Sequence, residues 1–434
     1  MSDYRIAVIG LWHLGETYSA GLSELGHAVV GISDDPAVVA NFSKNIPPLP
    51  EPQLEDLLAR NQKAGRLRYS TDYAEVKKCN VVWFTFDTPV NDDDEVDLSP
   101  IWNALDKCLP HLQDGVLIVM TSQIPVGTSK ELVELVKKKR PDIRFDYAYT
   151  PENLRLSEAV KCFMEPGRIV VGADSETAFR KMTEIFAALK TEIVRMTVAT
   201  AEMTKHALNA FLATSVSFIN DIADVCERSG ADVLDVAYAL RADARIGKKA
   251  FLDAGLGFSG GTLGRDLKAL MAFAKRNKMR VPVVEAAFEK NKDREALVVK
   301  RLTEALKDLS GKQMTILGLT YKPGTRTLRR SRALGIAAEL AGKGVALRLS
   351  DPVVQEAELP KISKATFVRD LYAAAEGSDV FILVTPWPEF KDIDFKKLAG
   401  AMKKGAIVFD TANLLRDQKG AIEKLGLRYF GVGR

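Results

Sequence analysis

The chain has 434 residues, a length that suggests about three structural units, and its 47% hydrophobic and 27% charged residues are typical of soluble globular proteins. Its 61 basic and 57 acidic side chains leave a net charge of only +4, so no overall attraction to nucleic acid or membranes is expected. No apolar run reaches the roughly 18 residues that a membrane-spanning helix needs, and the first residues do not resemble a signal peptide. Four cysteines without CxxC spacing predict neither a disulfide framework nor a metal site. We therefore expect a cytoplasmic protein without nucleic-acid, membrane or metal partners.

Short apolar segments alternate with helical patterns through about the first 195 residues. Residues 5–10 are predicted to form a buried strand that ends at glycine, residues 16–25 a helix, and residues 27–33 a second strand, as in a βαβ unit. This alternation predicts an α/β fold with a doubly wound sheet. Further strands are expected at residues 81–85, 116–121, 145–149 and 169–172.

A long uninterrupted helix is predicted for residues 200–229, which contain neither proline nor glycine. Thirty helical residues would span about 45 Å. Apolar residues occur on more than one face of this helix, so we expect it to connect domains and to offer a homodimer surface. Further helical patterns occupy residues 234–276, with a glycine-rich break at 255–264, and residues 290–305.

The last part of the chain repeats the alternating pattern. Strands are predicted at residues 314–320, 345–349, 380–385 and 406–410, and a helix at residues 332–341. A second Rossmann-like domain is therefore expected, without a glycine-rich fingerprint of its own. The predicted domains are a dinucleotide-binding domain at residues 1–196, a central helical domain at 197–308 and a second Rossmann-like domain at 312–434.

The turn after the first strand departs from the GxGxxG fingerprint of dinucleotide-binding domains. Gly10 and Gly15 occupy the first and third glycine positions, but Trp12 replaces the glycine that lets pyrophosphate approach the backbone. At the end of the second strand, Ser33 stands where an acid would bind the ribose, and Asp34 follows one residue late. Two interpretations remain open: a dinucleotide bound weakly or in a shifted pose, or a domain that no longer binds a cofactor normally.

The whole chain resembles the UDP-glucose/GDP-mannose dehydrogenase family. The similar segments lie in the same order from one end to the other, which makes the resemblance specific. They are residues 47–58 (PPLPEPQLEDLL), 122–128 (SQIPVGT), 150–155 (TPENLR), 166–172 (PGRIVVG), 201–227, 245–247, 251–261 (FLDAGLGFSGG), 321–325 (YKPGT) and 431–434 (GVGR).

The resemblance implies an enzyme of polysaccharide biosynthesis that oxidises the C6 alcohol of a UDP- or GDP-linked sugar with NAD, as a homodimer formed through the central helix. It implies that the cofactor-binding residues are Gly10, Trp12, Leu14, Gly15, Ser33, Asp34, Thr88, Pro89 and Ser122. The implied substrate-binding residues are Leu154, Arg245, Phe251, Leu252, Gly257, Phe258, Gly260, Lys322 and Arg329.

The resemblance also implies the catalytic residues Lys205, Asn209, Asp266 and Glu152, with Thr262 at the position of the family's nucleophile. Lys205 and Asn209 lie four residues apart, so both project from one face of a helix. From the residues alone, Lys205 could instead extend its ammonium group to solvent. Asp266 could simply be a favourable charge at a helix start.

Three groups that the family uses for its second oxidation are replaced in this chain. Thr262 falls where the family has a cysteine that captures the aldehyde, and a threonine hydroxyl does not ionise near neutral pH as a thiol can. Leu156 replaces a glutamate and Gln123 a threonine, both of which act on the hydrolytic water in the family. We therefore expect that the cysteine thioester route is not used.

The sequence thus predicts an NAD-dependent nucleotide-sugar oxidoreductase. Two alternatives remain open at this point. One is an epimerase or isomerase that retains NAD and returns the hydride to the same sugar. The other is a non-catalytic protein that binds sugar nucleotides.

Overall fold

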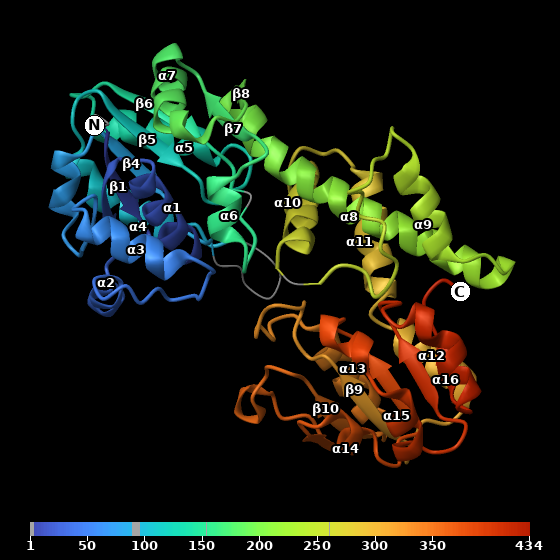
Figure 1. Ribbon diagram of the computed structural model, residues 1–434. Helices are drawn as coiled ribbons and strands as arrows, with labels where there is room; N and C mark the ends of the chain where they lie inside the picture. The colour runs from blue at the N-terminus through green and yellow to red at the C-terminus, as the bar shows by residue number, and fades with distance from the viewer. Residues whose placement is uncertain (1–3, 89–95, 153, 260) are drawn as a thin grey trace. The chain divides into compact units, whose positions relative to one another are not determined.

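The computed structural model describes residues 4–88, 96–152, 154–259 and 261–434. The chain forms two compact units, Met1–Leu208 and Asn209–Arg434, and the boundary falls inside one long helix (Figure 1). Among the described residues, no helix is both long enough and apolar enough to cross a membrane.

The first unit is built on a sheet whose described strands follow the order β3-β2-β1-β4-β5-β6-β7-β8. Neighbouring strands are parallel except β6 and β7, which pair antiparallel. The predicted doubly wound sheet is confirmed, whereas this reversal is a difference, because alternating apolar segments do not indicate strand direction. The strands are β1 (Arg5–Ile9), β2 (Ala28–Ile32), β3 (Leu67–Ser70), β4 (Val81–Phe84), β5 (Val116–Met120), β6 (Phe145–Tyr149), β7 (Ile169–Ala173) and β8 (Ile193–Met196).

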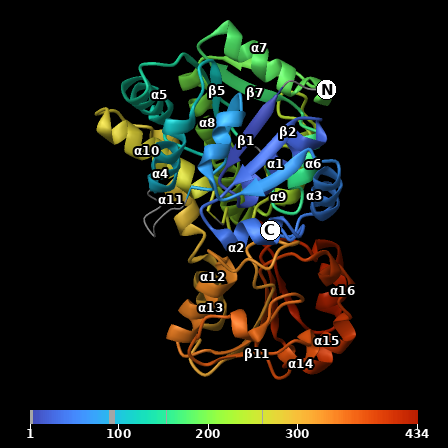
Figure 2. The ribbon, with the colours of Figure 1, turned by 90° about the vertical axis from the view of Figure 1, so that its left-hand side faces the viewer.

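Both faces of this sheet are buried, which explains the nearly continuous apolar strands. Val8 and Trp83 face the core formed with α1, α3, α6 and α7, whereas Ile9 and Phe84 face the core formed with α4, α5 and the start of α8 (Figure 2). The helices are α1 (His13–Glu24), α2 (Pro36–Phe42), α3 (Leu54–Lys63), α4 (Ser99–Cys108), α5 (Thr128–Lys139), α6 (Ala159–Met164), α7 (Glu176–Ile185) and α8 (Val198–Ser229).

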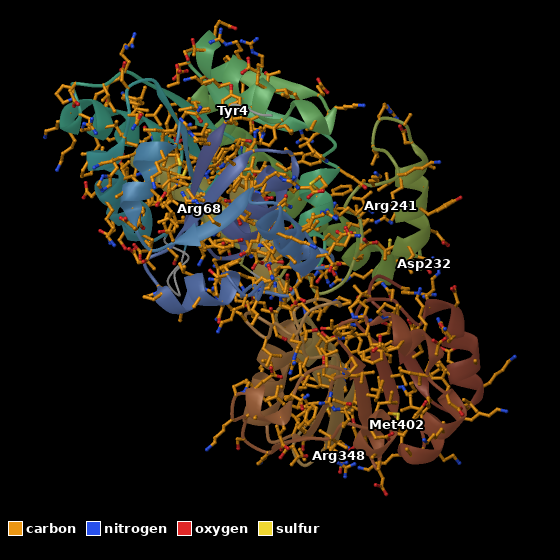
Figure 3. All side chains as sticks on the ribbon, turned by 60° about the vertical axis from the view of Figure 1, so that its left-hand side comes forward. Tyr4, Arg68, Asp232, Arg241, Arg348 and Met402 are labelled. Atoms are coloured by element: carbon orange, nitrogen blue, oxygen red, sulfur yellow. The ribbon has the colours of Figure 1, made fainter. Side chains whose placement is uncertain are left out.

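The second unit contains a parallel sheet whose described strands follow the order β11-β10-β9-β12-β13-β14, as the repeated pattern predicts. Met402 is buried in its core, and Arg348 of β10 donates a hydrogen bond to the carbonyl oxygen of Glu376 at 2.6 Å (Figure 3). The strands are β9 (Gln313–Leu317), β10 (Ala346–Ser350), β11 (Ala365–Phe367), β12 (Val380–Leu383), β13 (Ile407–Asp410) and β14 (Arg428–Phe430). The helices are α9 (Val233–Ala242), α10 (Leu263–Arg276), α11 (Pro282–Asp293), α12 (Leu297–Leu306), α13 (Arg332–Gly342), α14 (Leu371–Ala375), α15 (Phe395–Ala401) and α16 (Lys419–Lys424).

The predicted long helix is confirmed as α8, but the helix expected over residues 290–305 is wrong as a single element. α11 ends at Asp293 and α12 begins at Leu297. Between them Arg294 is almost completely buried and pairs with Asp224 of α8 at 2.8 Å. The chain therefore turns at a buried arginine that is held by an ion pair with α8, and the helical pattern did not reveal this contact.

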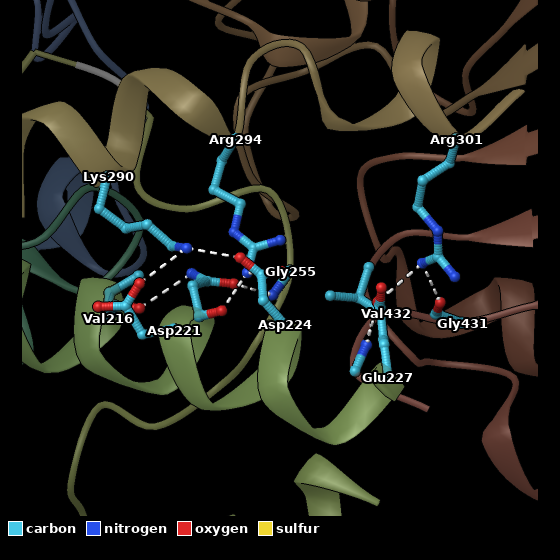
Figure 4. Close-up of polar contacts among 12 residues, drawn as sticks. Val216, Asp221, Asp224, Glu227, Gly255, Lys290, Arg294, Arg301, Gly431 and Val432 are labelled. Carbon is cyan, nitrogen blue, oxygen red and sulfur yellow. Dashed lines mark hydrogen bonds and ion pairs between the residues drawn. The ribbon is translucent and has the colours of Figure 1, made fainter. Parts of the chain in front are cut away.

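The end of the chain is fixed to α8 inside the second unit. Glu227 accepts hydrogen bonds from the backbone nitrogen of Gly433 at 2.8 Å and from Nη1 of Arg301 at 2.9 Å. Arg301 also donates to the carbonyl oxygen of Gly431 at 2.6 Å (Figure 4). The terminal GVGR segment is thus part of the packed structure.

Candidate functional site

The turn between β1 and α1 keeps the backbone geometry of a dinucleotide-binding turn. Gly10 has a φ of +95°, which favours glycine, and a Cβ at Gly15 would lie 1.8 Å from the carbonyl oxygen of Gly10. Trp12 has an extended backbone conformation (φ −128°) and is 49% exposed. Its side chain therefore does not strain the turn. Two of the three glycine positions therefore meet the requirement for close packing of strand and helix.

A carboxylate lies at the start of α1. The backbone nitrogen of Leu14 donates a hydrogen bond to Oδ2 of Asp87 at 3.1 Å. Backbone N–H groups at this helix start are those that hold the pyrophosphate of a dinucleotide in a Rossmann domain. The glycines therefore fit the cofactor, whereas Asp87 takes a donor that the cofactor would use. Sequence reasoning missed Asp87, although an acid soon after β4 at the carboxyl edge of the sheet was a usable signal.

A buried glutamate follows in the same helix. Glu16 is completely buried; its Oε2 accepts a hydrogen bond from the backbone nitrogen of Leu49 at 3.4 Å, and its Oε1 has no hydrogen-bond partner among the described residues. The pKa of Glu16 is raised to about 9, chiefly by burial and to a smaller extent by the nearby Glu51 and Asp87, against the opposing effect of the hydrogen bond from Leu49. Glu16 is therefore protonated at neutral pH.

Glu51 joins α1 to the segment before α6. Its Oε1 lies 3.1 Å from Nε2 of His13 and accepts a hydrogen bond from the backbone nitrogen of Ser157 at 2.8 Å. Its Oε2 accepts from the backbone nitrogen of Ala159 at 3.1 Å. Three acids, Glu16, Glu51 and Asp87, thus lie near the start of α1, where the helix dipole stabilises negative charge.

The residues at the end of β2 make local contacts. Oγ of Ser33 accepts a hydrogen bond from the backbone nitrogen of Asp35 at 3.3 Å. The exposed Asp34 pairs with Lys107 at 2.6 Å and accepts from the hydroxyl group of Tyr73 at 3.4 Å. A ribose hydroxyl would therefore share Asp34 with a lysine.

The remaining predicted cofactor residues lie after β4 and β5. Thr88 donates from Oγ1 to the carbonyl oxygen of Gln123 at 2.8 Å. Ser122 is completely buried, and its carbonyl oxygen accepts from the hydroxyl group of Tyr149 at 3.4 Å. Pro89 lies outside the described residues. The cofactor-binding roles of these residues stay predictions.

Lys205 and Glu152 form a buried pair in the first unit. Nζ of Lys205 lies 2.6 Å from the carbonyl oxygen and 2.9 Å from Oε1 of Glu152. Oε2 of Glu152 accepts a hydrogen bond from the backbone nitrogen of Leu154 at 2.7 Å. Only 6% of the Lys205 side chain is exposed, so its amine does not extend to solvent.

Asn209 and Asp266 form a second buried pair, inside the second unit. Nδ2 of Asn209 donates a short hydrogen bond to Oδ2 of Asp266. Both residues are buried, and Asp266 lies in the first turn of α10. A charge at a helix start is stabilising in itself, but its burial beside an amide is also typical of groups that hold a polar substrate.

The glycine-rich segment before α10 carries Thr262. This residue caps α10 without a side-chain hydrogen bond to the helix, and it is exposed. Gly260 lies outside the described residues. An exposed hydroxyl at a helix start has no feature that would make it a strong nucleophile.

The segment that resembles the sugar-nucleotide loop is held by α11 and α13. Asn291 accepts a hydrogen bond on Oδ1 from the backbone nitrogen of Phe258 at 2.8 Å, and Arg332 donates to the carbonyl oxygen of Phe258 at 2.7 Å. Gly257 has a φ of +78°, and a Cβ there would lie 2.3 Å from Oδ1 of Asn291. The loop conformation therefore requires both the glycine and the asparagine.

An ionic network, in which Arg294 is buried and Asp224 is partly exposed, supports the same loop from α8. Asn220 accepts on Oδ1 from the backbone nitrogen of Gly255 at 3.0 Å, and Arg294 donates to the carbonyl oxygen of Asn220. Asp224 pairs with Arg294 at 2.8 Å and with Lys290 at 2.5 Å (Figure 4). Sequence reasoning missed this support, although complementary charges at helical spacing in residues 221–224 and 290–294 were visible.

Other predicted substrate residues are more scattered. Arg245 pairs with its neighbour Asp243 at 2.7 Å. Phe251 is 49% exposed, whereas Leu252 is buried. The ammonium group of Lys322 lies 5.7 Å from the ring centre of Tyr321. Leu154 packs against the core of the first unit, and Arg329 is exposed between β9 and α13.

Comparison with known proteins gives a consistent result along the chain. Residues 4–190, 199–293 and 315–417 match the NAD binding domain, the central domain and the UDP binding domain of the UDP-glucose/GDP-mannose dehydrogenase family. The UDP-glucose 6-dehydrogenase of Rickettsia bellii is 33% identical over 99% of both chains. The UDP-glucose 6-dehydrogenase TuaD of Bacillus subtilis is 33% identical over 99% of this chain and 93% of its own. The solved structure of a UDP-glucose dehydrogenase from Pyrobaculum islandicum superposes with a TM-score of 0.89 at 28% identity, covering 100% of this chain and 98% of the other.

These matches confirm the predicted family, fold class and cofactor. They do not favour an epimerase, an isomerase or a non-catalytic binding protein. The chain belongs to the UDP-glucose/GDP-mannose dehydrogenase family and is an NAD-dependent nucleotide-sugar dehydrogenase.

Proposed function

We propose that this enzyme oxidises the C6 hydroxyl group of a UDP-linked hexose, with UDP-glucose as the first substrate to test, and releases the carbonyl compound. The UDP binding domain and the names of the similar dehydrogenases support the substrate class. The observation that carries the reaction is the pairing of Lys205, whose side chain is only 6% exposed, with Glu152 in the first unit.

The chemistry of this pair suits the oxidation of an alcohol. When hydride leaves a carbinol carbon, negative charge on the oxygen must be stabilised and the hydroxyl proton must move to a base. The amine of Lys205 can donate a hydrogen bond to that oxygen. The carboxylate of Glu152, which holds this amine, is the acceptor for the proton. NAD supplies the hydride acceptor when bound.

The residues that the family uses for the second oxidation are replaced in this chain. Thr262 cannot form a thioester as a cysteine can, and Leu156 offers no base to activate water for its hydrolysis. The aldehyde or its hydrate therefore leaves as the product. The joint replacement of both residues supports this outcome more strongly than either one alone.

A single assay separates this function from its alternatives. Purified protein is incubated with NAD and a panel of UDP- and GDP-linked hexoses, and reduced cofactor and sugar products are measured together. We expect net cofactor reduction with a UDP-hexose. Conversion of the sugar without net reduction would instead identify an epimerase or isomerase, and binding without conversion a non-catalytic protein.

We also propose that two copies associate through α8. Phe211, Phe218 and Val225 are 70%, 47% and 61% exposed and follow one another at seven-residue spacing. That spacing places them along one stripe of the helix. Large apolar side chains exposed in a continuous stripe are typical of protein interfaces.

A cytoplasmic location fits the four cysteines, which are unpaired in the structure.

A further inference from the structure

The position of Asp87 is set by the packing of its segment against the dinucleotide turn. Thr85 donates from Oγ1 to the carbonyl oxygens of Ile9 at 3.1 Å and of Gly10 at 2.8 Å. A Cβ at Gly10 would lie 3.1 Å from the ring of Phe86. Two residues in a row thus contact the turn, and the next one, Asp87, meets the helix start at the nitrogen of Leu14.

The helix start offers few donors, so this contact matters for an anion. The first hydrogen bond of α1 runs from the nitrogen of Glu16 to the carbonyl oxygen of Trp12 at 2.7 Å, which leaves the nitrogen of Leu14 among the groups without a partner inside the helix. Asp87 satisfies this nitrogen with a negative charge, as a phosphate would. Glu51 is a second acid in the same region, whereas Glu16 is protonated at neutral pH.

We propose that Asp87 competes within the molecule for the place of the NAD pyrophosphate, so that the cofactor binds only when this carboxylate leaves the nitrogen of Leu14. The proposal rests on the NAD site of the family and assigns a residue that sets its affinity. It predicts weak binding that strengthens with ionic strength, because salt screens the repulsion between carboxylate and pyrophosphate. Anion sites at helix starts normally show the opposite salt dependence.

A purely structural cap is the other explanation of the same contact. In that case, loss of the carboxylate would lower stability and leave cofactor affinity unchanged or weaker. Competition instead requires affinity to rise when the charge is removed. The two explanations therefore differ in the sign of one measurable change.

The test is calorimetric titration of the full chain with NAD and with ADP-ribose, which carries the same pyrophosphate. Asp87→Asn removes the charge alone, and Asp87→Gly removes both charge and acceptor. We expect each variant to bind both ligands about tenfold more tightly than the wild type, with the salt dependence lost or reversed. Circular dichroism and thermal melting show whether each variant is folded.

Asp114→Asn is the matched control, because Asp114 precedes β5 and so lies at the opposite edge of the same sheet. It removes one negative charge and should leave cofactor affinity unchanged. The affinity for UDP-glucose should be the same in all variants. Absence of UDP-glucose binding in every variant would count against the proposed substrate and not against the role of Asp87. Equal or weaker NAD binding by folded Asp87 variants, including no binding by any of them, would overturn the proposal.

Discussion

The side-chain nitrogen of Lys205 lies 2.9 Å from Oε1 of Glu152, with 6% and 14% of the two side chains exposed. Removal of one member of a buried pair leaves the other charge without compensation, which costs on the order of 3 kcal/mol. The pair makes us expect a cost to stability together with the loss of activity.

Lys205→Met should lower turnover on the order of a hundredfold to ten-thousandfold and also lower the melting temperature. The double variant Lys205→Met, Glu152→Gln should recover much of the melting temperature but none of the turnover. Lys181→Met is a control, because it removes a different ion pair of the first unit. Nζ of Lys181 lies 2.9 Å from Oδ2 of Asp146. Turnover that survives in folded Lys205→Met would place the chemistry elsewhere.

Glu16 should make the stability of the protein depend on pH. Its pKa is raised from 4.5 to about 9 in the folded state, chiefly by burial. The folded protein therefore keeps a proton on Glu16 that the unfolded chain loses above pH 4.5. The stabilisation that this proton gives to the folded state is complete below that pH. The effect declines as the pH rises and is lost by about pH 9.

Glu16→Gln should weaken this dependence, because the amide stays neutral. Melting temperatures measured between about pH 5 and about pH 9 should fall by several degrees less in this variant than in the wild type. Glu75→Gln is the comparison, because Arg68 and Lys78 lower the pKa of Glu75. The contribution of Glu75 to the pH dependence of stability therefore falls at more acidic pH. Parallel curves for the wild type and Glu16→Gln would show that Glu16 is ionised in the folded protein.

Thr262→Cys should not produce an efficient four-electron enzyme. A thiol at this exposed position can add to the aldehyde to give a thiohemiacetal, which loses a second hydride to NAD and becomes a thioester. Leu156 provides no base to activate water for hydrolysis of that thioester. We expect an intact-mass increase that corresponds to one oxidised nucleotide sugar, and no such increase in Thr262→Ser. Complete conversion to the uronic acid by Thr262→Cys alone would show that Leu156 does not limit hydrolysis.

Phe218→Asp should separate the proposed dimer, because it places a charge in the middle of the apolar stripe on α8. Molar mass from size-exclusion chromatography with light scattering should fall to that of one chain. Leu425→Asp, which changes a 37% exposed leucine in the second unit outside that stripe, should leave the mass unchanged. A wild-type protein of single-chain mass would contradict the dimer.

The sequence predicted the main elements because their signals are local. The apolar run of β1 and the absence of proline and glycine from α8 each identify an element within one segment. The short strands β3 (LRYS) and β11 (ATF) were missed because a few mixed residues give no clear periodicity.

The site was less predictable because its contacts join distant segments. Asp87 meets Leu14 only because β4 lies beside β1 in the sheet. Lys205 was singled out by resemblance, but its partner Glu152 stands 53 positions away in the sequence. Residue types and spacing therefore indicate the chemistry, whereas the pairing of groups follows from the fold.

The most direct test of the proposed reaction is the amount of reduced cofactor formed per UDP-glucose consumed. Absorbance gives the reduced cofactor, and mass spectrometry of the products, with a carbonyl-trapping reagent, gives the consumed sugar and its oxidation state. We expect one equivalent of reduced cofactor per sugar and a trapped carbonyl product. Two equivalents per sugar with a carboxylate product would contradict it.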